Sequence, residues 1–196
     1  PAGIPQPVLV RGTGLLGASI GIGLSAAGVD VRLHDPSPAA LAVAADIRAG
    51  RPARLDAEGD DLDVAPGLVV VAAPPDVTAD VVVDSLRRWP AAVVVDIASV
   101  KEAVAAGVRA AVDDGRLAPQ DADRYLGTHP MAGSERSGPV AARGTLFTQA
   151  PWVLCPTDTT HPGALAAGRA LARTLQATPY RMAARAHDES VAPVSY

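Results

Sequence analysis

The chain has 196 residues, of which 48% are hydrophobic and 19% are charged, so it can form a packed core and is not intrinsically disordered. Its net charge of −4, with no basic block, argues against a nucleic-acid-binding protein. The single cysteine, Cys155, excludes an internal disulfide and is typical of a reducing compartment, so we expect a cytoplasmic protein.

Residues 12–29 form an uncharged run that resembles a signal peptide or a membrane span. The run contains six glycines, too many for a good membrane helix, and a strand-like segment precedes it. We therefore reject the membrane interpretation. The chain starts at Pro1 without Met and stops at Tyr196 inside a helical pattern, so we expect it to be a fragment of a longer protein.

Short apolar runs alternate with helical patterns along the chain. We expect strands over 7–10, 31–34, 68–72, 93–96, 125–127, 152–155 and 179–182. We expect helices over 15–27, 38–49 (with Ser37 as N-cap), 76–88, 100–112 and 161–176, and another from 183 onward. The strands are rich in Val and almost continuously apolar, as a parallel sheet covered on both faces requires. This order predicts an α/β fold, a doubly wound Rossmann-type domain with a mostly parallel sheet.

A glycine motif follows the first predicted strand, in the sequence VLVRGTGLLG. Its G-x-G-x-x-G spacing permits a tight turn, close approach of the backbone to a pyrophosphate, and close packing of a helix on a strand. The helix that follows directs its N-terminal N–H groups towards the phosphates. We expect the cofactor to contact the whole loop: Gly12, Thr13, Gly14, Leu15, Leu16 and Gly17.

Asp35 ends the second predicted strand, 18 residues after Gly17. A carboxylate at this place accepts hydrogen bonds from the adenosine ribose and repels a 2′-phosphate, which favours NAD over NADP. Arg32 lies on the strand itself, so we do not expect it to bind a phosphate. The alternative is that the glycines form a packing turn and that Asp35 only starts the turn DPSP.

Two prolines follow the third predicted strand, in the sequence VVVAAPPDV. Pro74 and Pro75 have no N–H donor and hold the turn in an extended shape. At the carboxyl end of a strand, Ala73 and these prolines are expected to form a wall of the cofactor cleft. A rigid link between strand and helix explains the same residues equally well.

Asp96, Ser99 and Lys101 follow the fourth predicted strand, at the sheet edge where doubly wound folds bind ligands. The segment from Ser99 to Glu102 reads S-x-x-E, a capping box that opens a helix. A capping hydroxyl can also face a ligand, so Ser99 is a candidate contact for both cofactor and substrate. We expect Lys101 to occupy a solvated helix position.

The segment GTHPMAGSERSG, residues 127–138, follows the fifth predicted strand. His129 precedes Pro130, which favours an extended backbone, and its imidazole can titrate near neutral pH at this sheet edge. We expect His129 to act as a general base, a role that typically contributes ~10²–10⁴-fold to a rate. Ser134 and Glu135 are candidate substrate-binding residues. The alternative is a surface turn whose polar side chains are solvated.

The other histidines have structural explanations in the sequence. His34 ends a strand, His161 lies at a helix start, and His187 lies on the last predicted helix. We expect no metal site.

Five segments together resemble the prephenate/arogenate dehydrogenase family over nearly the whole chain. They are GTGLLGASIGIGL, VVVAAPPDV, DIASVKEAV, GTHPMAGSERSGPVAARGTLF and AHDESVAPVS. The run HPMAGSERSG is highly specific, whereas the glycine motif alone is not. The resemblance implies an N-terminal NAD(P) domain followed by a helical domain that forms a homodimer.

The resemblance also implies a reaction, the NAD-dependent oxidative decarboxylation of prephenate to 4-hydroxyphenylpyruvate in tyrosine biosynthesis. Hydride leaves the ring carbon that bears the 4-hydroxyl, and CO₂ departs as the ring becomes aromatic. The residue matching His129 takes the hydroxyl proton, and the residue matching Ser99 orients that histidine and the hydroxyl. The residue matching Glu135 belongs to a polar network at the mouth of the substrate site.

The chain departs from the family pattern near its C-terminus. The family often has His-Leu-Pro-His after Val-Ser, whereas here Tyr196 follows Ser195. We assign residues 1–182 to the dinucleotide-binding domain and 183–196 to the truncated start of the helical substrate and dimerisation domain. The isolated chain is therefore expected to bind dinucleotide but to turn over substrate poorly or not at all.

Several functions remain open at this point. The main hypothesis is a prephenate dehydrogenase, and the close alternative is an arogenate dehydrogenase, which acts on the amino analogue. A related hydroxyacid dehydrogenase shares the glycine loop but does not need the loop around His129. A non-catalytic NAD-binding module is expected to bind NAD regardless of prephenate.

Overall fold

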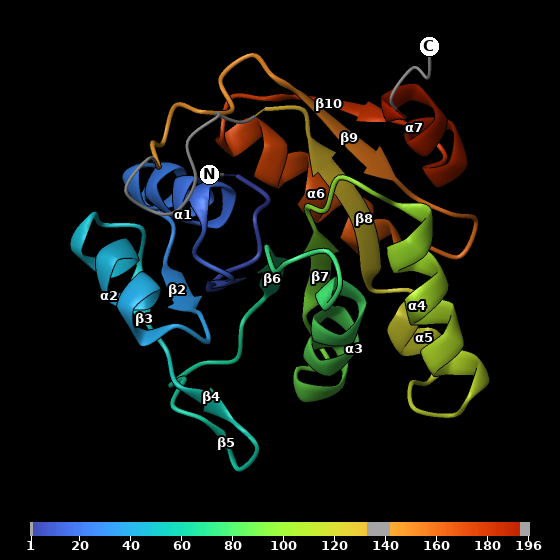
Figure 1. Cartoon of the computed structure of the whole chain (residues 1–196), viewed down its shortest axis with the longest axis horizontal. Helices are drawn as coiled ribbons and strands as arrows, with labels where there is room; N and C mark the ends of the chain where they lie inside the picture. The colour runs from blue at the N-terminus through green and yellow to red at the C-terminus, as the bar shows by residue number, and fades with distance from the viewer. Residues whose placement is uncertain (1, 133–141, 193–196) are drawn as a thin grey trace.

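The computed structural model describes residues 2–132 and 142–192. They form an eight-stranded sheet in the order β10-β9-β8-β7-β6-β1-β2-β3, parallel throughout except for the pair β8 and β9 (Figure 1). The strands of this sheet are β1 (Val8–Arg11), β2 (Val31–His34), β3 (Arg51–Pro52), β6 (Leu68–Val71), β7 (Val93–Asp96), β8 (Tyr125–Pro130), β9 (Pro151–Cys155) and β10 (Thr178–Arg181). The helices are α1 (Leu15–Ala26), α2 (Pro38–Asp46), α3 (Thr78–Arg88), α4 (Glu102–Asp113), α5 (Pro119–Ala122), α6 (Pro162–Thr174) and α7 (Ala184–Val191). The predicted doubly wound, mostly parallel fold is confirmed.

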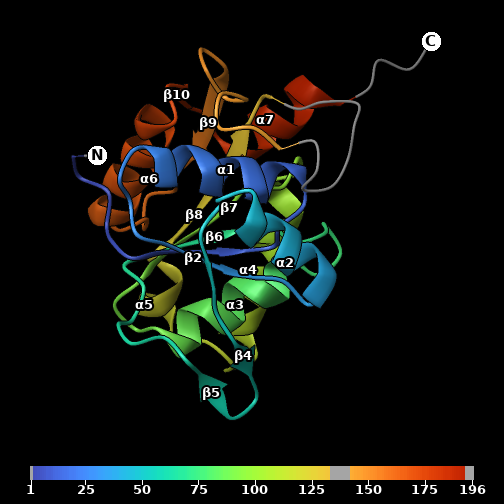
Figure 2. The same ribbon diagram turned by 90° about the vertical axis from the view of Figure 1, so that its left-hand side faces the viewer.

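Helices cover both faces of the sheet, which explains why its central strands β1, β6 and β7 consist mainly of Val and Leu. The helices α1, α2 and α6 pack on one face, and α3, α4 and α5 pack on the other (Figure 2). Alternate residues of β1 divide between the two cores, because Val8 and Val10 face the first group of helices and Leu9 faces the second. The central strands are thus held on both sides, and their carboxyl ends form one firm edge.

Helix starts follow the capping residues in two cases. The hydroxyl of Ser37 accepts a hydrogen bond from the backbone N–H of Ala40 at 3.2 Å, so the predicted N-cap of α2 is confirmed. His161 caps α6 through its Nδ1, which accepts from the N–H of Gly163 at 2.9 Å. No helix in the described part of the chain is long and apolar enough to span a membrane.

Four short elements were not predicted from the sequence. β3 adds an edge strand beside β2, and the polar connector after it forms a hairpin of β4 (Leu55–Asp56) and β5 (Gly59–Asp60) that projects from the body (Figure 1). The single turn α5 precedes β8. Elements of two to four residues carry too little periodicity to be recognised in a sequence.

The strand before the polar loop is longer than expected. β8 continues to Pro130 because its second half pairs antiparallel with β9, with His129 opposite Val153 and Pro130 opposite Trp152. The expectation that His129 lies in a loop after the strand is wrong. Its backbone belongs to the sheet, and this fixes the direction in which the imidazole leaves the main chain.

Candidate active site

A cleft of about 800 Å³ opens at the carboxyl ends of β1, β2, β6 and β7. This is the edge at which open α/β sheets bind ligands, and the volume lies within the range of small-molecule sites. The cleft walls contain most of the residues expected from the sequence: Gly12, Gly14, Leu15, Leu16, Gly17, Asp35, Ala73, Pro74, Pro75, Ser99 and His129. Arg11, His34 and Val81 also line the cleft and were not predicted.

Each glycine of the motif meets a different steric demand. Gly12 has φ +114°, and a Cβ there would lie 2.3 Å from the carbonyl oxygen of Ala72. A Cβ on Gly17 would lie 1.9 Å from the carbonyl oxygen of Gly12, so only glycine lets α1 approach the loop this closely. Gly14 has open space around it and begins α1 without a side-chain cap. The loop therefore leaves an accessible helix N-terminus, which fits an anionic pyrophosphate.

The carboxylate of Asp35 is held at the cleft wall by the glycine loop itself. Its Oδ2 accepts from both the backbone N–H of Thr13 at 2.8 Å and the hydroxyl of Thr13 at 3.0 Å. Its Oδ1 accepts from the N–H of Ser37 at 2.8 Å. A carboxylate has about four acceptor positions, so Asp35 keeps capacity for ligand hydroxyls.

Arg11, which lines the cleft, and Arg32, which does not, are both paired with carboxylates. Arg11 donates from Nη1 to Asp84 at 2.7 Å. Arg32 donates to Asp30 at 3.0 Å and to Asp63 at 2.8 Å. These contacts agree with the expectation that Arg32 does not serve as a phosphate ligand.

The proline turn is closed by a hydroxyl from the following helix. Thr78, the first residue of α3, donates to the carbonyl oxygens of Pro74 at 2.9 Å and Ala73 at 3.2 Å. Thr78 is buried, whereas both prolines are exposed on the cleft side. The turn is thus a rigid link and a cleft wall at once, so the two interpretations of this segment are compatible.

A buried ion pair lies beneath the end of β7. Lys101 Nζ bonds a carboxylate oxygen of Asp96 and donates to the carbonyl oxygen of Thr128 at 2.6 Å, while Tyr125 donates its hydroxyl to Asp96 at 2.7 Å. Lys101 is only 1% exposed, so the prediction of a solvated lysine is wrong. Burial, reinforced by the charge of Asp96, raises the pKa of Tyr125 well above its usual value.

The predicted capping box at Ser99 is also wrong. The helix α4 begins at Glu102, with Lys101 as N-cap and no side-chain cap from its own segment. The carboxylate of Asp188 on α7 takes that place, because it accepts from the N–H groups of Lys101 at 2.8 Å and Glu102 at 2.9 Å. Ser99 is exposed on the cleft wall.

The candidate base His129 contacts a second histidine that the sequence did not single out. Nδ1 of His129 lies 2.8 Å from Nε2 of His187, and Nδ1 of His187 lies 2.8 Å from a carboxylate oxygen of Asp188. His187 is fully buried, so the interpretation of it as an ordinary helix residue is incomplete. The available signal was the His-Asp pair within the segment AHDES, 58 residues after His129.

The environment of His129 keeps its imidazole neutral. Burial lowers its pKa to about 4, with smaller contributions from His187 and Lys101, whereas Asp188 acts in the opposite direction. At neutral pH the ring therefore carries an unshared electron pair that can accept a proton.

Two predicted substrate contacts, Ser134 and Glu135, lie outside the described residues, as does Tyr196. Within the described ranges 2–132 and 142–192, no group of His, Cys, Asp or Glu side chains could hold a metal ion.

Comparison with known proteins places these features in a family. The family model described as "Prephenate dehydrogenase, nucleotide-binding domain" matches residues 22–180. The protein named "Probable prephenate dehydrogenase NovF" from Streptomyces niveus is 36% identical over 187 residues, which cover 95% of this chain and 48% of that protein. The chain thus spans about half the length of this curated relative.

Solved structures agree with this assignment. The arogenate dehydrogenase of Synechocystis matches with a TM-score of 0.80 and 27% identity, over 95% of this chain and 63% of that one. The prephenate dehydrogenase of Aquifex aeolicus, solved with hydroxyphenyl propionate and NAD⁺, has a TM-score of 0.80 at 22% identity over 94% of this chain and 62% of that one, which supports the fold alone. The match of the family model over residues 22–180, together with the 36% identical relative, shows that this chain belongs to the prephenate dehydrogenase family, in its nucleotide-binding domain.

Proposed function

We propose that this chain is the NAD-binding part of an enzyme that oxidatively decarboxylates prephenate to 4-hydroxyphenylpyruvate. The observation that carries the proposal is the position of His129, a neutral imidazole that shares one cleft with the glycine loop and Asp35. A hydride acceptor bound along that loop and a base on the opposite wall are the two groups that this reaction needs.

A bound NAD would supply the hydride acceptor, and in the proposed reaction His129 accepts the proton of the substrate 4-hydroxyl. The electron pair of the ring–carboxylate bond then returns to the ring as CO₂ leaves, and the proton returns to the phenolic oxygen. Ser99, exposed on the same wall, is proposed to orient the hydroxyl. Ser134 and Glu135 are proposed to bind polar groups of the substrate. Aromatisation drives the reaction, so the protein mainly has to position the groups.

The cofactor is proposed to be NAD rather than NADP. The contacts that support this are those of Asp35, whose carboxylate is held at the cleft wall by Thr13 and Ser37. A carboxylate fixed there can accept hydrogen bonds from the ribose hydroxyls, and its negative charge repels a 2′-phosphate.

Arogenate is the second candidate substrate, because the Synechocystis structure with 27% identity is an arogenate dehydrogenase. We propose that the segment that begins at residue 183 leads into a helical domain that completes the substrate site and forms a homodimer. That domain is also the proposed source of groups that distinguish the keto side chain of prephenate from the amino side chain of arogenate.

The decisive experiment uses the complete protein and follows formation of the reduced cofactor, NADH or NADPH, with prephenate and arogenate in parallel, each with NAD and NADP. We expect turnover with NAD and one of the two substrates. The His129→Asn variant should lose about 10²–10⁴-fold in turnover while its NAD affinity stays close to that of the parent. NAD binding without turnover of either substrate would contradict the proposal and favour a related dehydrogenase or a binding module.

A further inference from the structure

The geometry points to His187 and Asp188 as a positioning pair that holds His129 in its Nδ1–H tautomer, with Nε2 left as the proton acceptor. This inference rests on the proposed role of His129 as a base. It concerns two residues of α7, which lies after residues 22–180 that match the family's nucleotide-binding domain.

The contacts run from His129 to His187 and from His187 to Asp188, and the carboxylate of Asp188 fixes the direction of both hydrogen bonds. An ionised carboxylate can only accept, so Asp188 requires that Nδ1 of His187 carry the hydrogen across their 2.8 Å contact. In a neutral imidazole the other nitrogen is then an acceptor. Nε2 of His187 must therefore receive a hydrogen from Nδ1 of His129, which lies 2.8 Å away. This leaves Nε2 of His129 unprotonated, on a ring that lines the cleft.

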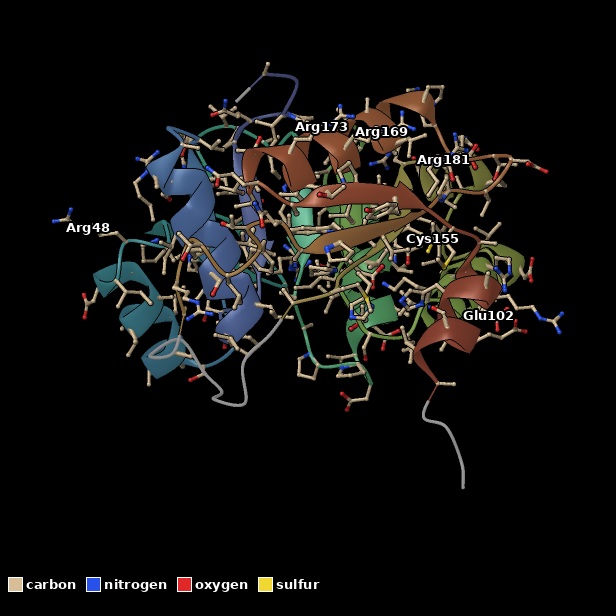
Figure 3. The ribbon with its side chains drawn as sticks, turned by 90° about the horizontal axis from the view of Figure 1, so that it is seen from above. Arg48, Glu102, Cys155, Arg169, Arg173 and Arg181 are labelled. Atoms are coloured by element: carbon tan, nitrogen blue, oxygen red, sulfur yellow. The ribbon has the colours of Figure 1, made fainter. Side chains whose placement is uncertain are left out.

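Asp188 itself is fixed by the opposite helix. Each of its oxygens accepts one backbone N–H at the start of α4, from Lys101 at 2.8 Å and from Glu102 at 2.9 Å. Although burial acts to raise it, the hydrogen bonds from Glu102, His187 and Lys101 hold the pKa of Asp188 below its usual value. Figure 3 shows Glu102 beside α7, where the two helices meet.

The packing around the two rings keeps this arrangement in place. His187 is fully buried, and its ring meets that of His129 edge-on, with the centroids 5.0 Å apart and an angle of 81° between the planes. Among residues 2–132 and 142–192, the charged and titratable groups that face His129 are His187, Asp188 and Lys101, and Lys101 is neutralised by Asp96. The wrong tautomer of a catalytic histidine severely reduces the rate in other enzymes, so this constraint has a direct chemical purpose.

The tautomer can be observed in the 196-residue chain without any substrate. We expect two-bond ¹H–¹⁵N spectra of the ¹⁵N-labelled chain at pH 7 to show His129 protonated at Nδ1 and unprotonated at Nε2, with its signals identified by their loss in His129→Asn. Asp188→Asn, which removes the charge but keeps the shape, should shift these signals towards the Nε2–H form, and His187→Leu should do so more completely. Glu189→Gln is the matched control, because this neighbour on α7 is exposed and its removal changes the helix charge equally.

The same variants in the complete protein connect the tautomer to the rate. Asp188→Asn should lower kcat with prephenate by about 10- to 100-fold, part of the contribution of a positioned base, while KM for NAD and the rate of Glu189→Gln stay at the parent values. The inference is overturned if His129 in the parent is the Nε2–H tautomer, which a protonated His187 would impose. It is also overturned if Asp188→Asn leaves the ratio of the Nδ1–H to the Nε2–H tautomer of His129 unchanged. If the parent oxidises neither prephenate nor arogenate, that result contradicts the proposed function instead, because the spectra do not depend on substrate.

Discussion

Asp35 is the residue to which we attribute the proposed preference for NAD over NADP. Replacing it with Ser removes the charge that accepts the ribose hydroxyls, so NAD affinity should fall about 10-fold, equivalent to about 1.4 kcal/mol, and the preference over NADP should narrow. Thr13→Val should have a smaller effect in the same direction, because it removes only the hydroxyl contact and keeps the backbone N–H bond to Asp35. Isothermal titration with both dinucleotides measures the effect. Asp46→Ser, an exposed change on α2, is the control, and an unchanged preference in Asp35→Ser would reduce Asp35 to a turn residue.

The pKa of His129 also predicts how stability depends on pH. In the native chain the pKa is about 4, whereas in the unfolded chain it is about 6.5, so between these values the unfolded state binds more protons. The free energy of unfolding should therefore decrease as the pH falls from about 6.5 towards about 4, by on the order of 1–3 kcal/mol from this group. Urea unfolding at pH 7.5 and pH 5 should show a smaller loss for His129→Asn than for the parent. Equal losses would mean that the pKa of His129 is the same in the native and unfolded states, which would contradict the prediction.

Residues whose position depends on near neighbours in the sequence were placed correctly in the cleft, whereas residues whose position depends on distant partners were not. The glycine loop and Asp35 are identified by their spacing around one strand-helix-strand unit. The prediction for Lys101 was wrong because its partners, Asp96 and Thr128, reach it only in the folded sheet. The interpretation of His187 was incomplete for the same reason, since its partner His129 is distant in the sequence. The predicted capping box at Ser99 was wrong in the same way, because Asp188 from another helix caps α4 instead.

At the scale of elements, two glycines where α1 packs on the glycine loop should affect different properties: Gly17 the stability of the fold, and Gly14 the binding of NAD. Gly17→Ala should cost about 1–3 kcal/mol of stability, because the new Cβ would lie 1.9 Å from the carbonyl oxygen of Gly12. Gly14→Ala should cost less than about 1 kcal/mol, because its side has open space, yet it should weaken NAD binding by placing a methyl group where the backbone meets the pyrophosphate. Urea unfolding and NAD titration of both variants test this. Equal stability losses in the two variants would contradict the steric argument.

The element pattern was predicted well where the strands are buried and poorly at the margins. β1, β6 and β7 were recognised because both faces are covered and their sequences are continuously apolar. The extension of β8 to Pro130 was missed because it depends on antiparallel pairing with β9, a contact that no local pattern reveals. This extension matters for function, because it carries His129 to the cleft.

At the scale of the whole molecule, the site joins segments from both ends of the chain. The glycine loop lies between β1 and α1, the candidate base His129 lies on β8, and its partners His187 and Asp188 lie on α7. Since α7 also caps α4 through Asp188, a displacement of this helix would affect both the fold and the tautomer of His129. The orientation of the base is thus coupled to the segment that leads out of the matched nucleotide-binding domain.

Binding of NAD should raise the stability of the folded chain, which gives a test on the chain of 196 residues alone. The proposed NAD site exists only in the folded chain, so NAD at 100 times its Kd should stabilise the chain by about 2.7 kcal/mol. For a chain of this size that corresponds to a rise in Tm of roughly 5–10 °C. NADP at the same concentration should produce a smaller rise, and turnover of prephenate should be weak or absent, because the chain spans about half of its curated relative. A Tm that does not respond to NAD would show that the cleft is not a dinucleotide site, whereas strong turnover would show that these residues alone complete the substrate site.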